Sequence, residues 1–368
     1  MSSSLSLLPT DSDYDELAAT IGRTASGIDS RRLHDCVCLV TGASRGIGKG
    51  IALELGKQGA TVYVTGTTSS SSSPSKDSST DTSVSSPGTI EETATTISQL
   101  GGTGIPVLCN HADDDQVQRL LDRIEKEQGR LDILVNNAFR LPPGGVEKLN
   151  SKFWEQGSEV WDSIHSVGLR SHFVATAKAM PLMLKSRENK PANLPRPIVA
   201  MVSSFGGLTY TFNVAYGVGK AGVDRLAKDM AMELTPEGIC VVSFWPGVVN
   251  TERTQASVAN GDWDKYVGIP LENAESPEFT GKAIVSVAAD PDNMSKTGTY
   301  QVVAELAQEY GFSDTNGRRP PSIRSLRFLL PSYAFDKETR AKVPNWLIPD
   351  WKLPFWVMAQ GAPPKKED

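Results

Sequence analysis

Residues 37–48 read Val-Cys-Leu-Val-Thr-Gly-Ala-Ser-Arg-Gly-Ile-Gly, and this stretch decides the fold. The apolar run Val37 to Val40 predicts a buried strand, and the pattern from Gly46 to Gln58 predicts a helix. Glycines at the junction permit a tight turn and let a pyrophosphate approach the backbone. A glycine-rich turn at the first strand-to-helix junction therefore indicates a dinucleotide site, and the alternative is a turn built for packing only.

The predicted cofactor contacts in this turn are Gly42, Ser44, Arg45, Gly46, Ile47 and Gly48. A site for NAD typically carries an acid at the end of the second strand, where it binds the ribose hydroxyls. Here that strand ends Val-Thr-Gly-Thr-Thr at residues 64–68, without an acid. Arg45 lies where it can meet a 2′-phosphate. Both observations favour NADP(H) over NAD as cofactor.

Strand and helix patterns alternate from residue 35 to about residue 312. This alternation predicts a single α/β domain, a doubly wound Rossmann fold with a parallel sheet. Further strands are expected at 61–65, 106–109, 133–136, 198–203 and 240–244, and further helices at 91–100, 114–128, 161–184 and 216–234.

Three segments lie outside this pattern. Residues 1–34 are expected to be a disordered extension, and the Ser-rich stretch 67–88 a flexible insertion. The tail 313–368 is Pro-rich and carries Trp346, Trp351 and Trp356. Tryptophans with a nearby lysine are typical of a membrane interface, so a peripheral membrane contact is one interpretation. The other is a lid over the substrate cleft or a subunit contact.

Composition excludes several classes of protein. The net charge of the 368 residues is −6, which argues against a nucleic-acid surface. The chain has no apolar run long enough for a membrane span and no secretory signal pattern, so we expect an intracellular protein. The four cysteines suit a buried core in a reducing compartment, and no metal site is expected.

Tyr216 and Lys220 are the candidate catalytic pair. Four residues apart on a predicted helix, they share one face. A free phenol has a pKa near 10, and a neighbouring ammonium lowers that pKa. By itself this spacing is more typical of an exposed surface pair, so its weight depends on the other motifs of the chain. Upstream, Ser203 and Ser204 end a predicted strand.

Two other strand ends carry candidate contacts. Asn136 ends the fourth strand, where its amide can contact the cofactor or bridge two loops. After the strand at 240–244 comes a turn from which the backbone and a hydroxyl can hold the nicotinamide amide; its candidate residues are Pro246, Gly247, Val249 and Thr251.

Taken in this order, the motifs resemble those of the short-chain dehydrogenase/reductase family from residue 35 to about residue 310. The resemblance implies that Tyr216 is the general acid/base, and that Lys220 lowers its pKa and binds the nicotinamide ribose. It implies that Ser204 polarises the substrate carbonyl. Ser203 has the family's usual spacing of thirteen before the tyrosine, but the motif context favours Ser204. A homo-oligomer is also expected, because the family commonly forms dimers or tetramers.

A narrower group within the family is similar at residues 167–172, 212–221 and 245–252. This likeness implies NADPH-dependent reduction of small apolar carbonyl compounds, steroid and xenobiotic ketones included, and association with the endoplasmic reticulum. The expected location of the protein is therefore cytoplasmic or endoplasmic reticulum-associated. Two alternatives stay open. One is an NADP-binding protein that turns over slowly or not at all, and the other is an NAD-dependent alcohol dehydrogenase working in the oxidative direction.

The chain departs from the family pattern at three positions. Gly168 stands where the family has an Asn that anchors a proton-relay water, and His165 or His172 on the same predicted helix can substitute for it. Phe139 replaces a glycine after Asn-Asn-Ala, where its ring is expected to crowd the loop. Asn110 stands where an acid near the adenine is usual.

Overall fold

The computed structural model describes residues 32–70, 88–142, 144–188 and 195–360. Most of the predicted N-terminal extension, 1–31, and of the predicted Ser-rich insertion, 71–87, lies outside the described residues.

Within the described residues, seven parallel strands form one sheet in the order β3-β2-β1-β4-β5-β6-β7. The order reverses between β1 and β4, which is the switch point where doubly wound sheets bind their ligands. The strands are β1 (Val37–Val40), β2 (Thr61–Gly66), β3 (Thr103–Leu108), β4 (Ile133–Asn136), β5 (Ile198–Val202), β6 (Cys240–Trp245) and β7 (Tyr300–Val302). The single Rossmann-type sheet predicted from the alternation is thereby confirmed.

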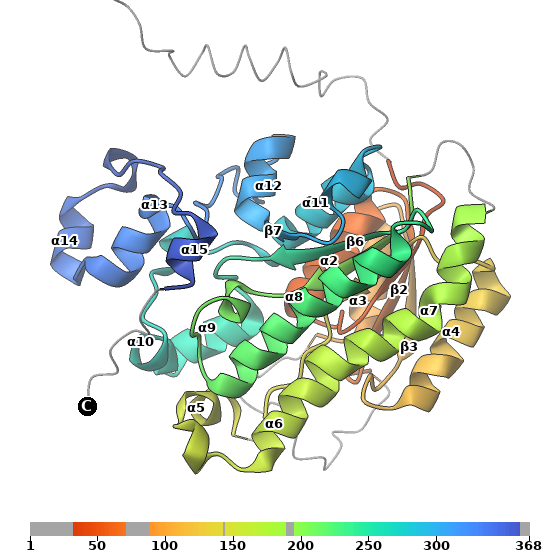
Figure 1. Ribbon diagram of the computed structural model, residues 1–368, viewed down its shortest axis with the longest axis horizontal. Coiled ribbons are helices and arrows are strands. Elements are labelled where there is room, and N and C mark those ends of the chain that lie inside the picture. The colour runs from red at the N-terminus through yellow and green to blue at the C-terminus, as the bar shows by residue number, and fades with distance from the viewer. Residues whose placement is uncertain (1–31, 71–87, 143, 189–194, 361–368) are drawn as a thin grey trace, which may run out of the picture.

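Helices cover both faces of the sheet (Figure 1). One face carries α2 (Gly46–Lys57), α3 (Ile90–Gln99), α11 (Pro277–Ala288) and α12 (Val303–Tyr310). The other carries α4 (Asp114–Gln128), α7 (Ser171–Glu188) and α8 (Val214–Leu234). The remaining helices are α5 (Gly145–Asn150), α6 (Ser158–His165), α9 (Glu252–Ala259), α10 (Asp262–Tyr266), α13 (Leu326–Leu329), α14 (Lys337–Lys342) and α15 (Phe355–Met358).

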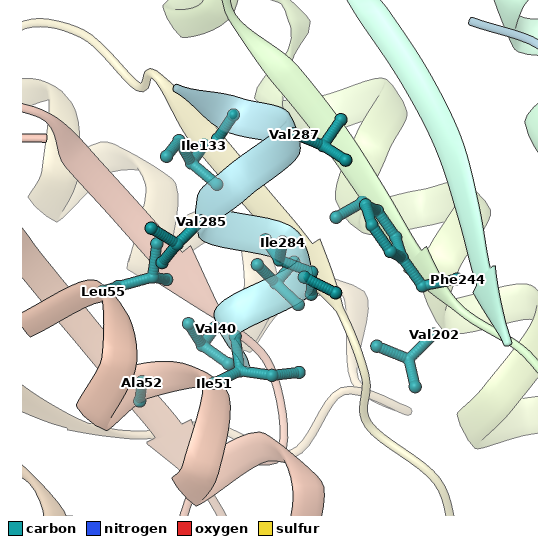
Figure 2. Packing of buried hydrophobic residues seen from close by; sticks show 14 of the residues in the cluster. Val40, Ile51, Ala52, Leu55, Ile133, Val202, Phe244, Ile284, Val285 and Val287 are labelled. Carbon is teal, nitrogen blue, oxygen red and sulfur yellow. The ribbon is translucent and has the colours of Figure 1, made fainter. Parts of the chain in front are cut away.

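The larger core lies between the sheet and the α2–α11 pair. Figure 2 shows Ile51 and Leu55 of α2 meeting Ile284 and Val285 of α11 over the strands. A Cβ on Gly50 would lie 2.2 Å from the Pro277 carbonyl carbon, so only glycine lets α2 approach the start of α11 this closely. This packing fixes the position of α2, and with it the glycine-rich turn that precedes the helix.

The predicted helix over 161–184 is wrong as one element. The chain forms α6, a π-helical turn at Ser166–Arg170, and α7. The break lies at Val167 and Gly168, whose backbone is not helical, and Gly168 has φ +138°. The apolar periodicity continues across this break, so it gives no sign of the kink. The sequence interpretation also missed β7. This edge strand has only three residues, and only the last of them, Val302, is buried, so it shows no apolar run.

The C-terminal tail packs on the core beside β7 and α12, blue in Figure 1. The Phe355 ring meets Trp245 and Tyr300 edge-on, at centroid distances of 5.7 and 4.9 Å. The Arg324 guanidinium binds both carboxylate oxygens of Glu305 on α12. The three tail tryptophans instead point outward, with Trp346, Trp351 and Trp356 more than 70% exposed. Among the described residues, no helix is long and apolar enough to cross a membrane.

Candidate active site

A cavity of about 1200 Å³ opens at the carboxyl ends of the strands. It runs from the β1–α2 turn, past the end of β5 and the start of α8, to residues of α10 and the tail. All of the predicted cofactor and catalytic residues except Asn136 line it: Gly42, Ser44, Arg45, Gly46, Ile47, Gly48, Ser204, Tyr216, Lys220, Pro246, Gly247, Val249 and Thr251.

The glycine-rich turn is a tight cradle. Gly42 and Gly46 have φ of +67° and +56°, a backbone region that disfavours other residues. A Cβ on Gly48 would lie 2.2 Å from the Gly42 carbonyl oxygen and 2.4 Å from the Asn137 amide nitrogen. The turn closes so tightly because these positions have no side chains, and it presents the start of α2 to the cavity. A pyrophosphate fits such a helix N-terminus.

An acidic side chain already binds this helix start. The backbone N–H of Gly46 donates to the Glu252 carboxylate across 2.9 Å. Helix α2 has no acid in its first turn, so Glu252 provides the negative charge that a helix N-terminus favours. The sequence interpretation missed Glu252, because 206 residues separate it from Gly46.

Arg45 extends from the turn toward the end of β2. Its guanidinium donates to the Thr68 hydroxyl at 2.8 Å. Thr67 and Thr68 line the cavity beside it. The positive charge therefore lies at the strand end where the sequence interpretation expected a 2′-phosphate.

Asn137, rather than Asn136, takes part in the cavity wall. The Asn136 side chain is fully buried and donates to the Thr176 hydroxyl on α7. The Asn137 amide donates to the carbonyls of Thr41 and Gly42, which joins the β4 end to the β1–α2 turn. The loop-bridging role that we considered for Asn136 thus belongs to its neighbour.

The two serines after β5 differ in orientation. Ser203 is buried, and its hydroxyl donates to the Lys220 carbonyl at 3.2 Å. Both serines line the cavity, but it is a hydrogen bond from the Ser204 side chain that acts to lower the pKa of Tyr216. The structure thus places Ser204 beside the phenol, as the motif context favoured, and Ser203 against the backbone of α8.

Tyr216 and Lys220 lie one turn apart near the start of α8. Asn213 caps the helix by accepting a hydrogen bond from the Tyr216 N–H, and the Lys220 ammonium donates to the Val202 carbonyl at 3.2 Å. Burial raises the pKa of Tyr216, whereas the Ser204 hydrogen bond opposes that shift. The net shift is therefore opposite to the lowering that we predicted from Lys220. Burial lowers the pKa of Lys220 to about 8, and Asp224 on the next turn acts to raise it.

The turn after β6 is held by a buried acid. Glu275 donates its N–H to the Val248 carbonyl and accepts from the Asn250 N–H through its own carbonyl. Burial raises the pKa of the Glu275 carboxyl to about 8, and a hydrogen bond from the Gly247 backbone opposes this. Thr251, expected to hold the nicotinamide amide, uses its hydroxyl oxygen as the N-cap of α9, where it accepts from the Thr254 N–H.

Neither histidine near Gly168 lines the cavity. His172 is buried, with its Nε2 3.2 Å from the Ala138 carbonyl oxygen. His165 packs against Trp161 with its ring tilted, at a centroid distance of 3.9 Å. Burial lowers the pKa of both imidazoles, that of His172 to about 3. Both side chains are therefore neutral near pH 7.

Apolar and aromatic side chains form much of the far half of the cavity, with the charged Arg253, Asp264 and Lys265 among them. Its wall comes from four separate parts of the chain, including the tail residue Tyr333. Side chains that line it are Leu141, Leu149, Phe205, Tyr210, Phe212, Trp263, Ile269 and Tyr333. Such a wall suits an apolar ligand placed next to the Tyr216 phenol.

Comparison with known proteins agrees with this arrangement. A family model for short chain dehydrogenases matches residues 36–262. Dehydrogenase/reductase SDR family member 1 of Mus musculus is 40% identical over 300 residues, which are 80% of this chain and 88% of that protein. The Homo sapiens protein of the same name is 36% identical over 324 residues, or 85% and 95% of the two chains. A 3-oxoacyl-(acyl-carrier-protein) reductase of Thermotoga maritima is 29% identical over 259 residues, or 70% and 92%.

Solved structures show the same fold. A short-chain type dehydrogenase/reductase from Mycobacterium marinum matches with a TM-score of 0.59 and 26% identity, covering 75% of this chain and 96% of its own. The predicted resemblance is confirmed by these matches. The chain is a member of the short-chain dehydrogenase/reductase family.

Proposed function

We propose that the protein reduces the carbonyl group of apolar ketones and aldehydes with NADPH. The observation that carries this proposal is the meeting of Ser204, Tyr216 and Lys220 at one point of the cavity, between the glycine-rich cradle and the apolar wall. When bound, NADPH supplies the hydride, and the protein supplies position and charge.

In this mechanism the Ser204 hydroxyl donates a hydrogen bond to the substrate oxygen, where negative charge grows in the transition state. Tyr216 donates its proton to the same oxygen. A raised pKa keeps the phenol protonated near pH 7, and this protonation state favours reduction over oxidation. Lys220 lies 5.9 Å from the centre of the Tyr216 ring, and its positive charge stabilises the phenolate left after the transfer.

A panel of ketones and aldehydes tests the reaction, with NADPH oxidation measured for wild type and Tyr216→Phe. Loss of a positioned proton donor typically lowers the rate by about 100- to 10,000-fold. NADPH binding, measured by its fluorescence, shows that the variant is still folded and loaded. Equal turnover by the two proteins would remove Tyr216 from the mechanism. A wild type that binds NADPH and reduces none of the panel would favour the binding-protein alternative.

The preference for NADPH rests on Arg45, whose guanidinium lies at the end of β2. A hydrogen bond to a charged group contributes about 1.5–3 kcal/mol, so Arg45→Ala should weaken NADPH binding by roughly 10- to 100-fold. Binding of NADH, which has no 2′-phosphate, should change little. If both cofactors lose affinity equally, Arg45 does not select the phosphate.

We also propose a peripheral membrane contact through the tail, as in a protein associated with the endoplasmic reticulum. The support is the outward position of Trp346, Trp351 and Trp356 beside the exposed Lys352. Co-sedimentation with anionic lipid vesicles should fall when the three tryptophans are replaced by serine. Unchanged sedimentation would contradict the membrane contact.

A further inference from the structure

Phe139 lies against both members of the catalytic pair. The Lys220 ammonium nitrogen is 5.4 Å from the centre of the Phe139 ring, over its face. The Tyr216 ring meets the Phe139 ring edge-on, with a centroid distance of 6.0 Å and an interplanar angle of 85°. The face of an aromatic ring is negative, so it attracts an ammonium, most strongly where water is excluded.

The backbone on both sides of Phe139 is fixed to the break between α6 and α7. Before it, the Ala138 carbonyl oxygen contacts the His172 ring nitrogen at 3.2 Å. After it, the Arg140 N–H donates to the Val167 carbonyl at 3.2 Å. These two contacts fix the backbone from which the ring extends toward Lys220.

Space for the ring exists because residue 168 has no side chain. A Cβ on Gly168 would lie 3.0 Å from Cδ2 of Phe139, closer than nine in ten real contacts of this kind. The φ of +138° at Gly168 also disfavours any side chain there. The large side chain at position 139 and the missing side chain at position 168 look separate in the sequence. In the structure they form one packing arrangement.

We propose that Phe139 is a positioning residue that keeps the Lys220 ammonium charged beside Tyr216, in a space that Gly168 leaves open. The inference rests on the proposed function, because it assigns Phe139 a role in the same proton transfer. Burial alone opposes a charge on Lys220, and two groups counter it: the carboxylate of Asp224 and the face of the Phe139 ring. Without the ring, Lys220 loses its proton at lower pH.

Several other titratable groups near Lys220 can also affect its pKa. On α8 these are Tyr216 and Asp224, and on α7 the neutral His172, whose pKa the charge of Lys220 helps to lower. On α6, His165 approaches Gly219, the residue before Lys220. A substitution at Phe139 removes none of these titratable groups, so a shift in the pKa of Lys220 that a control variant does not share can be assigned to the ring.

The deciding measurement is the pH dependence of acetylation of Lys220 by acetic anhydride, followed by peptide mass spectrometry. Only the neutral amine reacts, so the midpoint reports its pKa. Phe139→Leu keeps an apolar side chain of similar size but removes the ring face, and it should lower the midpoint by about half a pH unit. Phe212→Leu is the matched control, because Phe212 also meets Tyr216 edge-on, at 5.1 Å. Equal shifts in both variants, or a shift in neither, would overturn the proposal.

A second measurement tests the packing with Gly168. Gly168→Ala should lower the melting temperature in wild type and lower it less in a Phe139→Ala background. The backbone strain at residue 168 is the same in both backgrounds and cancels in the comparison. Additive effects would show that the ring and Gly168 do not share one space. Both measurements need no turnover, so they decide this proposal even if no carbonyl compound is reduced, which would refute only the proposed function.

If the protein reduces a carbonyl compound, the pH dependence of kcat/KM provides a third measurement. The decline of kcat/KM at high pH should begin about half a unit lower in Phe139→Leu than in Phe212→Leu. An unmoved decline together with a moved labelling midpoint would mean that Lys220 does not control the reaction, and the positioning role would then be wrong.

Discussion

The two halves of the cavity are built in different ways. At the cofactor half, one short stretch, residues 42–48, supplies the cradle, and its neighbours approach so closely that side chains are excluded. At the substrate half, single side chains from the β4–α5 loop, the β5–α8 loop, α10 and the tail each contribute part of a wall. The first half depends on backbone geometry and the second on side-chain surface. Substitutions of the cradle glycines should therefore be costly, and substitutions of single side chains in the wall should be tolerated better.

Gly48→Ala should have the largest effect. The new Cβ would lie 2.2 Å from a backbone oxygen, which cannot move without opening the turn. We expect NADPH affinity to fall by roughly 100-fold, equivalent to about 2.7 kcal/mol, together with a lower melting temperature. Gly217→Ala is the control, because a Cβ there meets its nearest neighbour at 3.4 Å. Isothermal titration with NADPH measures the affinity of both variants, and thermal unfolding measures their melting temperatures. Wild-type affinity in Gly48→Ala would show that the cradle is not rigid.

Tyr333→Ala should have a moderate and selective effect. The side chain is half-exposed and lines the substrate half from the tail. Such a contact contributes on the order of 1 kcal/mol to a bound apolar ligand, or roughly 5-fold in affinity. KM should rise for bulky ketones, while small aldehydes and NADPH binding are unaffected. Trp346→Ala, an exposed tail substitution, controls for disturbance of the tail. An equal rise in KM for large and small substrates would argue against a role for Tyr333 in selectivity.

This contrast also explains what the sequence could predict. The cradle and the Tyr216–Lys220 pair are local in the chain, and the order of the motifs around them was enough to predict both. Contacts between distant segments bring Asn137, Glu252 and Tyr333 to the cavity, and no local sequence pattern predicts such contacts. Gly168 and Phe139 were recognised as unusual, but only the structure shows that one makes room for the other. The break at Gly168 was missed because apolar residues continue at helical spacing across it.

Glu252→Gln should have the smallest effect, and its sign is informative. The Glu252 carboxylate accepts a hydrogen bond from the Gly46 N–H, at the helix start that a pyrophosphate would approach. A charge at a helix N-terminus contributes about 0.3–1 kcal/mol. Removing it should lower the free energy of unfolding by that amount, and should strengthen NADPH binding by roughly 2- to 5-fold because one competing anion is gone.

Glu278→Gln is the matched control for this prediction. Glu278 is also an acid in the first turn of a helix, α11, and its loss changes the net charge equally. That variant should lose stability without gaining affinity. NADPH titrations at low and high salt separate the two cases, because added salt screens the repulsion in wild type and reduces the difference from Glu252→Gln. Weaker NADPH binding in Glu252→Gln would mean that the carboxylate supports the cofactor instead of competing with it. The cofactor half would then depend on a side chain from the β6–α9 segment, and the contrast between the two halves would be smaller than the cradle suggests.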